Sequence, residues 1–401
     1  MTGWITTNLG SLARYINGRA FKPNDWGTTG LPIVRIANLN SSSAALDYFA
    51  GDLASGHRIN TGDIVVSWSA TLDAFIWDRG PAALNQHIFK VVPDRHVDEE
   101  FLFYALKRAM IGLAGLVHGA TMKHVTKPEF ESFKLRIPQK ISEQRRIAAR
   151  LKTQLAAVEQ ARQAAQAQLV EAEALQEAIY RDTFANIVPV TVPLTFESAP
   201  AGWRWAKLGD IAQLESGHTP SRSRPDWWGG DISWLSLTEI RALDGRWVDE
   251  TQIRTNAAGI ANSSARILPR GTVCFSRTAS VGFVAIIGQP MATSQDFANW
   301  VCGDELEPEF LMHALIRSRQ ELRAIATGAT HHTIYMPALN SFHLCLPDRP
   351  AQQRIVARLK KQLAAIHQMR AAAQTQLAEI KALPARLLAQ AFNSTDEGIS
   401  P

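Results

Sequence analysis

An internal repeat limits the possible folds of this 401-residue chain more than any other property of its sequence. Residues 144–184 align without gaps on residues 352–392, and about half of the aligned positions are identical. Alanine and glutamine are common in both segments, but charged positions such as Arg146 and Arg354 also match, which compositional bias alone does not explain. A repeat of this kind indicates a structural unit that is used twice.

The repeat continues outside these two segments, with small changes in length. Matched pairs include Trp4 with Trp203, Gly18 with Gly217, Ser67 with Ser276, Gln86 with Gln295, Thr121 with Thr330, and Phe133 with Phe342. The sequence therefore predicts a tandem of two units, each of them a globular domain followed by a long helix.

The two aligned segments have the composition of helices, because Ala, Gln, Leu, Glu and Arg are frequent and glycine is absent. Their apolar residues recur at alternating intervals of three and four, a narrow seam that fits packing against one other helix. The seam positions, which are also the candidates for partner docking, are Leu155, Val158, Leu169, Ile179, Leu363, Ile366, Leu377 and Leu387. Each helix would be about 60 Å long at a rise of about 1.5 Å per residue. Pro384 predicts a kink or an early end in the second helix.

The rest of each unit has a mixed pattern, so the predicted fold class is α+β. Short runs of β-branched and aromatic residues predict strands at 33–36, 63–67, 88–92 and 135–137, and a helix is expected at 99–110. The expected segments are a first globular domain at 1–140, a first spacer helix at 141–186, a linker at 187–202, a second globular domain at 203–348, a second spacer helix at 349–393 and a tail at 394–401. If the helices form an antiparallel coiled coil, the two domains lie at its opposite ends and are related by a pseudo-two-fold axis.

Composition and missing motifs exclude several classes of protein. The cysteines Cys274, Cys302 and Cys345 form no CxxC pair, so neither a zinc site nor a disulfide framework is expected. The start of the chain does not resemble a signal peptide, and no apolar stretch is long enough to span a bilayer, so we expect a cytoplasmic protein without a membrane partner. The sequence has no phosphate-binding Walker loop, no Asn-Pro-Pro-aromatic stretch and no glycine-rich nucleotide fingerprint. We therefore predict no catalytic residue, no metal ligand and no enzymatic activity in this chain.

Several motifs occur in the same order in both units. The sharpest are Trp203 followed by Leu208-Gly209-Asp210-Ile211-Ala212, the stretch from Gly271 to Gly282, and the Gly-Ala-Thr turns that end at Thr121 and Thr330. With these motifs and its two helices, the chain resembles the specificity subunits of type I restriction-modification systems over essentially its whole length. The first unit departs from the pattern at 67–71, where it lacks the arginine and the final glycine.

This resemblance implies that each globular domain is a target-recognition domain that reads one half of a split sequence in double-stranded DNA. The helices would set the gap between the two halves and help to dock methyltransferase (modification) subunits. Methylation and cleavage would belong to those subunits and to ATP-dependent restriction subunits. The implied cofactors, S-adenosylmethionine, ATP and Mg²⁺, would be held by the partners, and none would be held by this chain.

Candidate DNA contacts lie in loops rich in small polar residues. They are Lys22, Asn24, Arg35, Ser67, Trp68, Gln86, Thr121, Lys123 and His124 in the first unit, and Thr219, Ser221, Arg222, Arg277, Thr278, Gln295, Thr330, His331 and His332 in the second. An arginine such as Arg277 can pair with guanine or grip phosphate, and Gln86 and Gln295 can read adenine or hold a turn. Positions shared by both units suit phosphate contacts or scaffolding better than base reading, because the two domains read different half-sites.

The net charge of +5 permits nucleic-acid binding without establishing it. The charge is concentrated at 352–392, where Glu379 is the single acidic residue. The basic residues of this segment are Arg354, Arg358, Lys360, Lys361, Arg370, Lys381 and Arg386. This basic helix could follow DNA phosphates, meet acidic surfaces of partner subunits, or present a solvated face. An alternative function is a duplicated coiled-coil adaptor that binds protein or carbohydrate instead of DNA.

Overall fold

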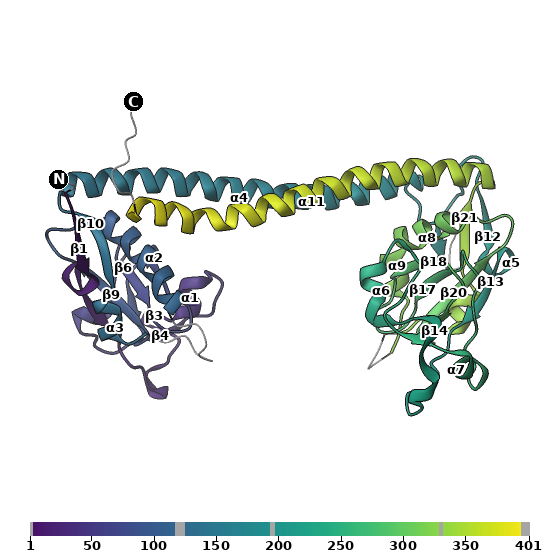
Figure 1. Ribbon diagram of the computed structural model, residues 1–401, viewed down its shortest axis with the longest axis horizontal. Coiled ribbons are helices and arrows are strands. Elements are labelled where there is room, and N and C mark those ends of the chain that lie inside the picture. The colour runs from purple at the N-terminus through teal and green to yellow at the C-terminus, as the bar shows by residue number, and fades with distance from the viewer. Residues whose placement is uncertain (1–2, 117–124, 193–196, 329–331, 394–401) are drawn as a thin grey trace. The chain divides into compact units, whose positions relative to one another are not determined.

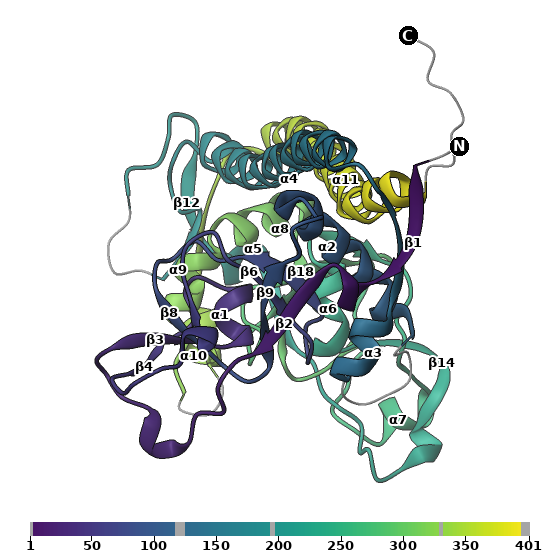
Figure 2. The same ribbon diagram turned by 90° about the vertical axis from the view of Figure 1, so that its left-hand side faces the viewer.

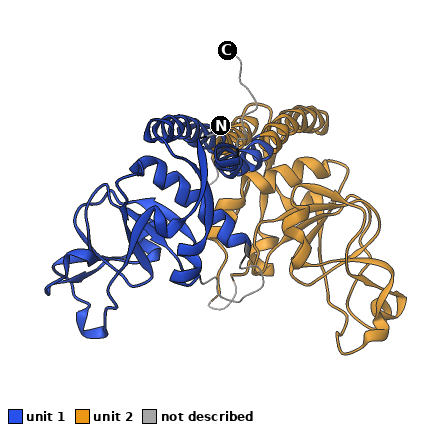
Figure 3. Cartoon of the chain, turned by 60° about the vertical axis from the view of Figure 1, so that its left-hand side comes forward, with its two compact units in different colours: residues 1–167, 373–401 blue, residues 168–372 orange. Residues whose placement is uncertain are grey.

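The computed structural model describes residues 3–116, 125–192, 197–328 and 332–393. They form two compact units, which Figure 3 shows in different colours. Unit 1 comprises residues 1–167 and 373–401, and unit 2 comprises residues 168–372. The two long helices, α4 (Ile141–Thr183) and α11 (Arg349–Asn393), each contribute to both units.

Unit 1 is built on a four-stranded sheet of order β2-β9-β6-β7, with a second sheet of order β4-β3-β8-β5 and the two-stranded pair β1-β10. The strands are β1 (Trp4–Asn8), β2 (Ala13–Asn17), β3 (Leu31–Val34), β4 (Asp47–Phe49), β5 (Arg58–Ile59), β6 (Ile64–Ser67), β7 (Asp73–Ile76), β8 (Ala82–Leu84), β9 (Ile88–Pro93) and β10 (Lys134–Pro138). The helices are α1 (Ile36–Asn40), α2 (Glu99–Leu116) and α3 (Lys127–Ser132), besides α4 and α11. Figure 1 shows these elements below the two long helices.

Unit 2 has a similar plan, but its main sheet has five strands instead of four, and its other two sheets have three strands each. Its main sheet has the order β13-β20-β17-β18-β15, and β11-β21-β12 and β16-β14-β19 form smaller sheets. The strands are β11 (Val190–Thr191), β12 (Arg204–Lys207), β13 (Ala212–Ser216), β14 (Trp228–Leu235), β15 (Arg246–Val248), β16 (Arg254–Thr255), β17 (Val273–Ser276), β18 (Val284–Ile287), β19 (Ala292–Thr293), β20 (Phe297–Cys302) and β21 (His343–Leu346). The helices are α5 (Leu208–Ile211), α6 (Leu237–Leu243), α7 (Ala257–Ala261), α8 (Pro308–Arg317), α9 (Arg319–Ala324) and α10 (Met336–Asn340).

Burial in the core of each unit explains why its central strand is a continuous apolar run in the sequence. All four residues of β6 and of β17 are buried, because both faces of each strand are covered. Alternate side chains enter different core clusters, Val66 and Val65 in unit 1 and Phe275 and Cys274 in unit 2. Side chains of α2 cover the sheet in unit 1, and those of α8 cover it in unit 2. The sequence-based strands at 33–36, 63–67, 88–92 and 135–137 are confirmed to within two residues at their ends. The helix expected at 99–110 is confirmed too, but it extends to Leu116.

The helices α4 and α11 lie side by side in antiparallel orientation (Figures 1 and 2). In unit 1 the early residue Leu151 of α4 shares a core cluster with the late residue Leu388 of α11. In unit 2 the late residue Phe184, just after α4, shares a cluster with the early residue Leu359 of α11. All the sequence-predicted seam positions are buried or half-buried, which confirms that each helix packs through that seam.

Two expectations from the sequence need revision. The early end expected at Pro384 is wrong, because α11 continues through it to Asn393. The proline removes a backbone donor, but Leu388 and Phe392 beyond it are buried in the core of unit 1, and this burial favours the continued helix. The segment expected as a linker, 187–202, contains β11, which pairs with β21 in unit 2. Among the described residues, none of the helices combines the length and hydropathy needed to cross a membrane.

Candidate nucleic-acid interface

A tight loop after the central strand is built in the same way in both units. It follows β6 in unit 1 and β17 in unit 2, and each copy contains an alanine with left-handed backbone geometry. The φ angle is 59° at Ala70 and 55° at Ala279. This conformation costs a residue with a Cβ atom about 1–2 kcal/mol, so the surrounding contacts must hold it. The two units thus share a specific loop geometry in addition to their strand order.

In unit 2, backbone bonds tie this loop to two other loops. Ile334 N donates to Arg277 O at 2.9 Å, and Ala279 N donates to His332 O at 3.0 Å. Arg277 N donates to Asp296 O at 2.8 Å. The loops 276–282, 294–297 and 332–334 therefore form one surface, which we call loop cluster 2.

A fourth loop joins loop cluster 2 at Gly217. His218 N donates to Thr293 O at 2.9 Å, and the Thr219 hydroxyl donates to the side-chain oxygen of Gln295. A Cβ atom on Gly217 would come within 2.1 Å of Ser294 O, so only glycine permits this approach. Gly18, the matched residue, has the same constraint, because its Cβ atom would lie 2.2 Å from Asn85 O. These contacts explain why both glycines are part of the repeat.

Unit 1 assembles the corresponding loops, which we call loop cluster 1. Val125 N donates to Trp68 O at 3.3 Å, the counterpart of the bond from Ile334 to Arg277. Gly18 N donates to Ile88 O at 3.0 Å. Some of the predicted contact residues, Trp68 and Gln86 in unit 1 and Thr219, Arg277 and Gln295 in unit 2, therefore come from distant parts of the sequence to one loop system in each unit.

The matched residues Trp68 and Arg277 both support their loops, although their chemistry differs. Trp68 stacks on Phe89, with ring centroids 5.6 Å apart and an interplanar angle of 21°. The Arg277 guanidinium donates through Nη2 to Gln295 O at 2.9 Å and through Nη1 to Ile334 O at 3.4 Å. Both side chains are half-buried, and their main contacts are with other residues of the chain.

Other predicted contacts are exposed in the same loops. Gln86 and Gln295 are both exposed; the Gln86 amide nitrogen lies 3.2 Å from His87 Nε2. Because Gln295 accepts the Thr219 hydroxyl through its side-chain oxygen, its amide nitrogen remains as a donor. Thr278 is half-buried and His332 is exposed.

The remaining candidates occupy more distal parts of the units. Lys22 and Asn24 are exposed around a short 3-10 turn, and Ser221 and Arg222 are exposed after Thr219. Arg35 forms an ion pair with Asp47 at 2.6 Å. Thr121, Lys123, His124, Thr330 and His331 lie outside the described residues.

Ser67 is a correction to the sequence-based set of contacts. Its side chain is fully buried, and its hydroxyl donates to Ser69 O at 3.1 Å inside the loop. The hydroxyl is needed to close the turn and cannot reach a ligand outside it. The match between Ser67 and Ser276 has the same explanation, because the Ser276 hydroxyl also bonds within its own loop, to Ser280 O.

The sequence-based set omitted three arginines that contact loop 276–282, namely Arg241, Arg319 and Arg323. They lie on α6 and α9, far from the loop along the chain, so no motif joined them to it. The repeat held a usable signal, because the aligned positions in unit 1 are the uncharged residues Asn40, Met110 and Ala114.

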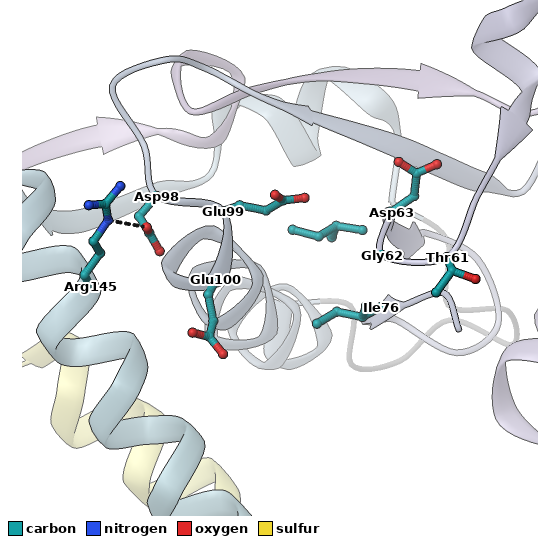
Figure 4. Close-up of a pocket in the computed structure, with 9 residues that line it drawn as sticks. Thr61, Gly62, Asp63, Ile76, Asp98, Glu99, Glu100 and Arg145 are labelled. Atoms are coloured by element: carbon teal, nitrogen blue, oxygen red, sulfur yellow. Dashed lines mark hydrogen bonds and ion pairs between the residues drawn. The ribbon is translucent and has the colours of Figure 1, made fainter. Parts of the chain in front are cut away.

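A surface cavity of about 720 Å³ in unit 1 has an acidic lining that includes Asp63, Asp98 and Glu100 (Figure 4). Arg145 points at Asp98 and forms an ion pair with it at 3.0 Å. Lys90 lies 2.8 Å from Asp63, and Lys152 lies 2.8 Å from Glu100. These carboxylates therefore serve ion pairs. In the part of the chain that the structure describes, no group of three or more His, Cys, Asp or Glu side chains is placed to hold a metal.

One strongly shifted pKa lies in the core of unit 2, away from the loops. His313 is only 5% exposed, and burial lowers its pKa to about 4 against an opposing effect of Glu309. Its Nδ1 atom is hydrogen-bonded to the Tyr180 hydroxyl at 3.0 Å, and burial raises the pKa of that hydroxyl. The pair joins α4 to α8 and is structural.

Comparison with known proteins gives consistent results. The type I restriction modification DNA specificity domain matches residues 1–167 and 200–376. The MjaIX specificity subunit of a type I restriction enzyme from Methanocaldococcus jannaschii is 28% identical over 159 residues, which cover 39% of this chain and 37% of that protein. The EcoBI specificity subunit from Escherichia coli is 28% identical over 159 residues, which cover 39% of this chain and 33% of that protein. The matched segment thus spans only about a third of these curated relatives.

Solved structures share the fold over almost the entire chain. One, described as the structural basis of complex assembly and conformational transition of the type I R-M system, has a TM-score of 0.78 at 19% identity and covers 97% of both chains. The HsdS subunit from Thermoanaerobacter tengcongensis has a TM-score of 0.60 at 21% identity and covers 98% of this chain and 97% of that one. These findings do not support the alternative of an adaptor for protein or carbohydrate. Because the family model matches most of its length, the chain belongs to the family of type I restriction modification DNA specificity domains.

Proposed function

We propose that this chain is the DNA-reading specificity subunit of a type I restriction-modification complex and recognises a target in two separated halves. The observation that carries the proposal is that one loop system is built twice on the same scaffold, with different side chains at matched positions. Trp68 in unit 1 corresponds to Arg277 in unit 2. The loop of unit 1 with Lys22 and Asn24 corresponds to the loop of unit 2 with Thr219 and Ser221. A shared scaffold with unshared loop residues suits two readers of different sequences.

The structure suggests a division of labour within each loop cluster. The shared residues Gly18, Gly217, Ala70 and Ala279 shape the backbone, so they are poor candidates for base reading. Unshared, exposed side chains such as that of Arg222 are free to meet base edges. The glutamines Gln86 and Gln295 are shared, so they suit backbone contacts or scaffolding better. We assign Arg277 to positioning, because both of its terminal nitrogens donate to backbone carbonyls.

We further propose that catalysis belongs to partner subunits. Methyltransferase subunits would bring S-adenosylmethionine, and ATP-dependent restriction subunits would bring ATP and Mg²⁺, all in the cytoplasm. The seam residues of α4 and α11 are largely used within the chain, so docking would involve the outer faces of the helices. In unit 2 the exposed basic residues Arg354, Arg358 and Lys361 of α11 are candidates for that surface.

The experiment is to express the chain with its modification subunits and to map the methylated bases by sequencing. A bipartite target is expected. Replacing Thr219, Ser221 and Arg222 by alanine should change only one half of it, whereas replacing Lys22 and Asn24 should change only the other half. A continuous target, or one whose two halves both change with either variant, would contradict the assignment of one half-site to each unit.

A further inference from the structure

Three arginines of unit 2 converge on one aromatic ring beside loop cluster 2. The guanidinium carbons of Arg241, Arg319 and Arg323 lie 5.6, 5.3 and 5.4 Å from the centroid of the Phe283 ring. Phe283 is half-buried between loop 276–282 and β18, so the ring is fixed by its surroundings. Stacking on a fixed ring confines each guanidinium without using its N–H donors.

The same arginines are bonded directly to loop 276–282. Arg319 Nε donates to Gly282 O at 2.8 Å, and Arg323 Nε donates to Val281 O at 2.8 Å. Arg241 Nη2 lies 3.3 Å from the Ser280 hydroxyl oxygen. The cluster is therefore a continuation of loop cluster 2, and any ligand of that loop would pass beside it.

The positive charge of the cluster is only partly compensated. Arg319 Nη2 contacts both carboxylate oxygens of Asp244, at 2.7 and 2.8 Å. Within the described ranges of the chain, neither Arg241 nor Arg323 has an ion pair, and both are exposed. The pKa of Arg323 lies below the ordinary arginine value because its guanidinium is partly desolvated and lies near the charge of Arg319. Three arginines and one carboxylate leave a net positive charge, which a bound anion would neutralise.

We propose that Arg241 and Arg323, ordered by Phe283 and by the Arg319–Asp244 pair, form a clamp in which each of them holds one backbone phosphate of the DNA that loop cluster 2 reads. This proposal rests on the proposed function. A guanidinium presents a planar fork of donors that matches phosphate oxygens, and here it is ordered before binding. Duplex DNA carries one charge per about 1.7 Å of its axis, so a loop that reads bases is always flanked by phosphates.

Unit 1 lacks this clamp, although it retains the contact that connects helix and loop. Asn40 Nδ2 donates to Thr71 Oγ1 at 3.2 Å, which corresponds to the contact of Arg241 with Ser280. The positions aligned with Arg319 and Arg323 are Met110, which is buried, and Ala114. The clamp therefore belongs to one half-site only, and it is an addition to the shared scaffold.

The test measures how the affinity of the full chain for a fluorescent 40-base-pair duplex of mixed sequence depends on salt. Each phosphate contact adds about 0.9 to the slope of log affinity against log salt. We expect Arg241→Gln and Arg323→Gln each to lower the slope by about 0.9, and the double variant to lower it by about 1.8. Between 50 and 200 mM salt, the double variant should then lose about twelvefold less affinity than the parent chain.

Two further variants serve as controls. Arg323→Lys keeps the charge and should keep the slope. Arg270→Gln removes an exposed arginine that also stacks on an aromatic ring, Trp247 at 5.5 Å, and should leave the slope unchanged. Thermal unfolding should show that all variants are folded. The methylated sequence should be the same for every variant, because a phosphate contact carries no sequence information.

The outcomes separate the clamp from the proposed function. A parent chain that binds duplex DNA, with slopes unchanged in Arg241→Gln and Arg323→Gln, would overturn the clamp and leave the specificity function intact. Weakened association with the methyltransferase subunit at unchanged DNA slopes would assign the arginines to a protein partner and would also overturn it. If the parent chain and its complex with the methyltransferase both fail to bind duplex DNA, the proposed function fails and the clamp fails with it.

Discussion

Replacing Arg277 by alanine would distinguish a residue that positions loops from one that reads a base. In the structure its guanidinium joins three loops, because Nη2 donates to Gln295 O at 2.9 Å and Nη1 to Ile334 O at 3.4 Å. Alanine removes both contacts but leaves the backbone bonds at Arg277 in place. The loops should still form, with less restraint on their relative positions.

The size of the effect follows from these distances. A hydrogen bond from a charged donor contributes about 1.5–3 kcal/mol, and the 2.9 Å bond to Gln295 is of this kind. The 3.4 Å contact to Ile334 is too long to add much. We therefore expect Arg277→Ala to lower the free energy of unfolding of unit 2 by about 2 kcal/mol. For a unit of this size, such a loss lowers Tm by roughly 4–8 °C.

The assay combines calorimetry with methylation of a library of half-site variants by the complex. Because three loops lose a common restraint, discrimination should weaken at every base pair of the second half-site and stay unchanged in the first. Thr278→Ala is a suitable control, since this half-buried neighbour has no side-chain hydrogen bond among the described contacts, and its Tm should not change. An Arg277→Ala chain with unchanged Tm and altered preference at one base pair only would show that Arg277 reads that base, and would refute the positioning role.

Three other predictions concern stability, helix length and catalysis. His313 has a folded-state pKa of about 4, below its ordinary value, so the unfolded chain takes up the proton first and stability falls as pH drops from about 6.5 to about 4. Between pH 7 and pH 5, this histidine should lower the free energy of unfolding of unit 2, measured by urea denaturation, by roughly 2 kcal/mol. The His313→Asn variant should not show this loss, and equal pH dependence in both chains would contradict the prediction. Insertion of one turn after Ala165 and after Ala373 lengthens each helix by about 5.4 Å and should widen the unspecified gap in the methylated sequence, whereas an unchanged gap with an altered half-site would contradict this role. The chain without partners should neither methylate nor cut DNA, and single-turnover methyl transfer by the purified chain would disprove this.

Much of the fold could be predicted because local patterns determine it. The seam of α4 and α11 follows from residues such as Leu155 and Leu363 at helical spacing, and any helix with that pattern must bury it. The buried strands β6 and β17 are recognisable as short apolar runs between turn residues. Because each pattern occurs in both copies of the repeat, each of these inferences was supported twice. Pro384 shows the limit of local rules, because its cost to the helix is outweighed by the burial of Leu388 and Phe392 in a core built from distant residues.

The composition of the candidate site was decided by tertiary structure. The sequence identified which loops carry polar and basic residues, but it could not tell that Ser67 turns inward, or that Arg277 reaches the carbonyls of Gln295 and Ile334, 18 and 57 residues away along the chain. The convergence of Arg241 and Arg323 on Phe283 likewise required α6 and α9 to meet the same loop. Side-chain type and spacing are local properties that a sequence displays. The partner of a hydrogen bond or of a charge depends on which segments folding brings together, and only the three-dimensional arrangement contains that information.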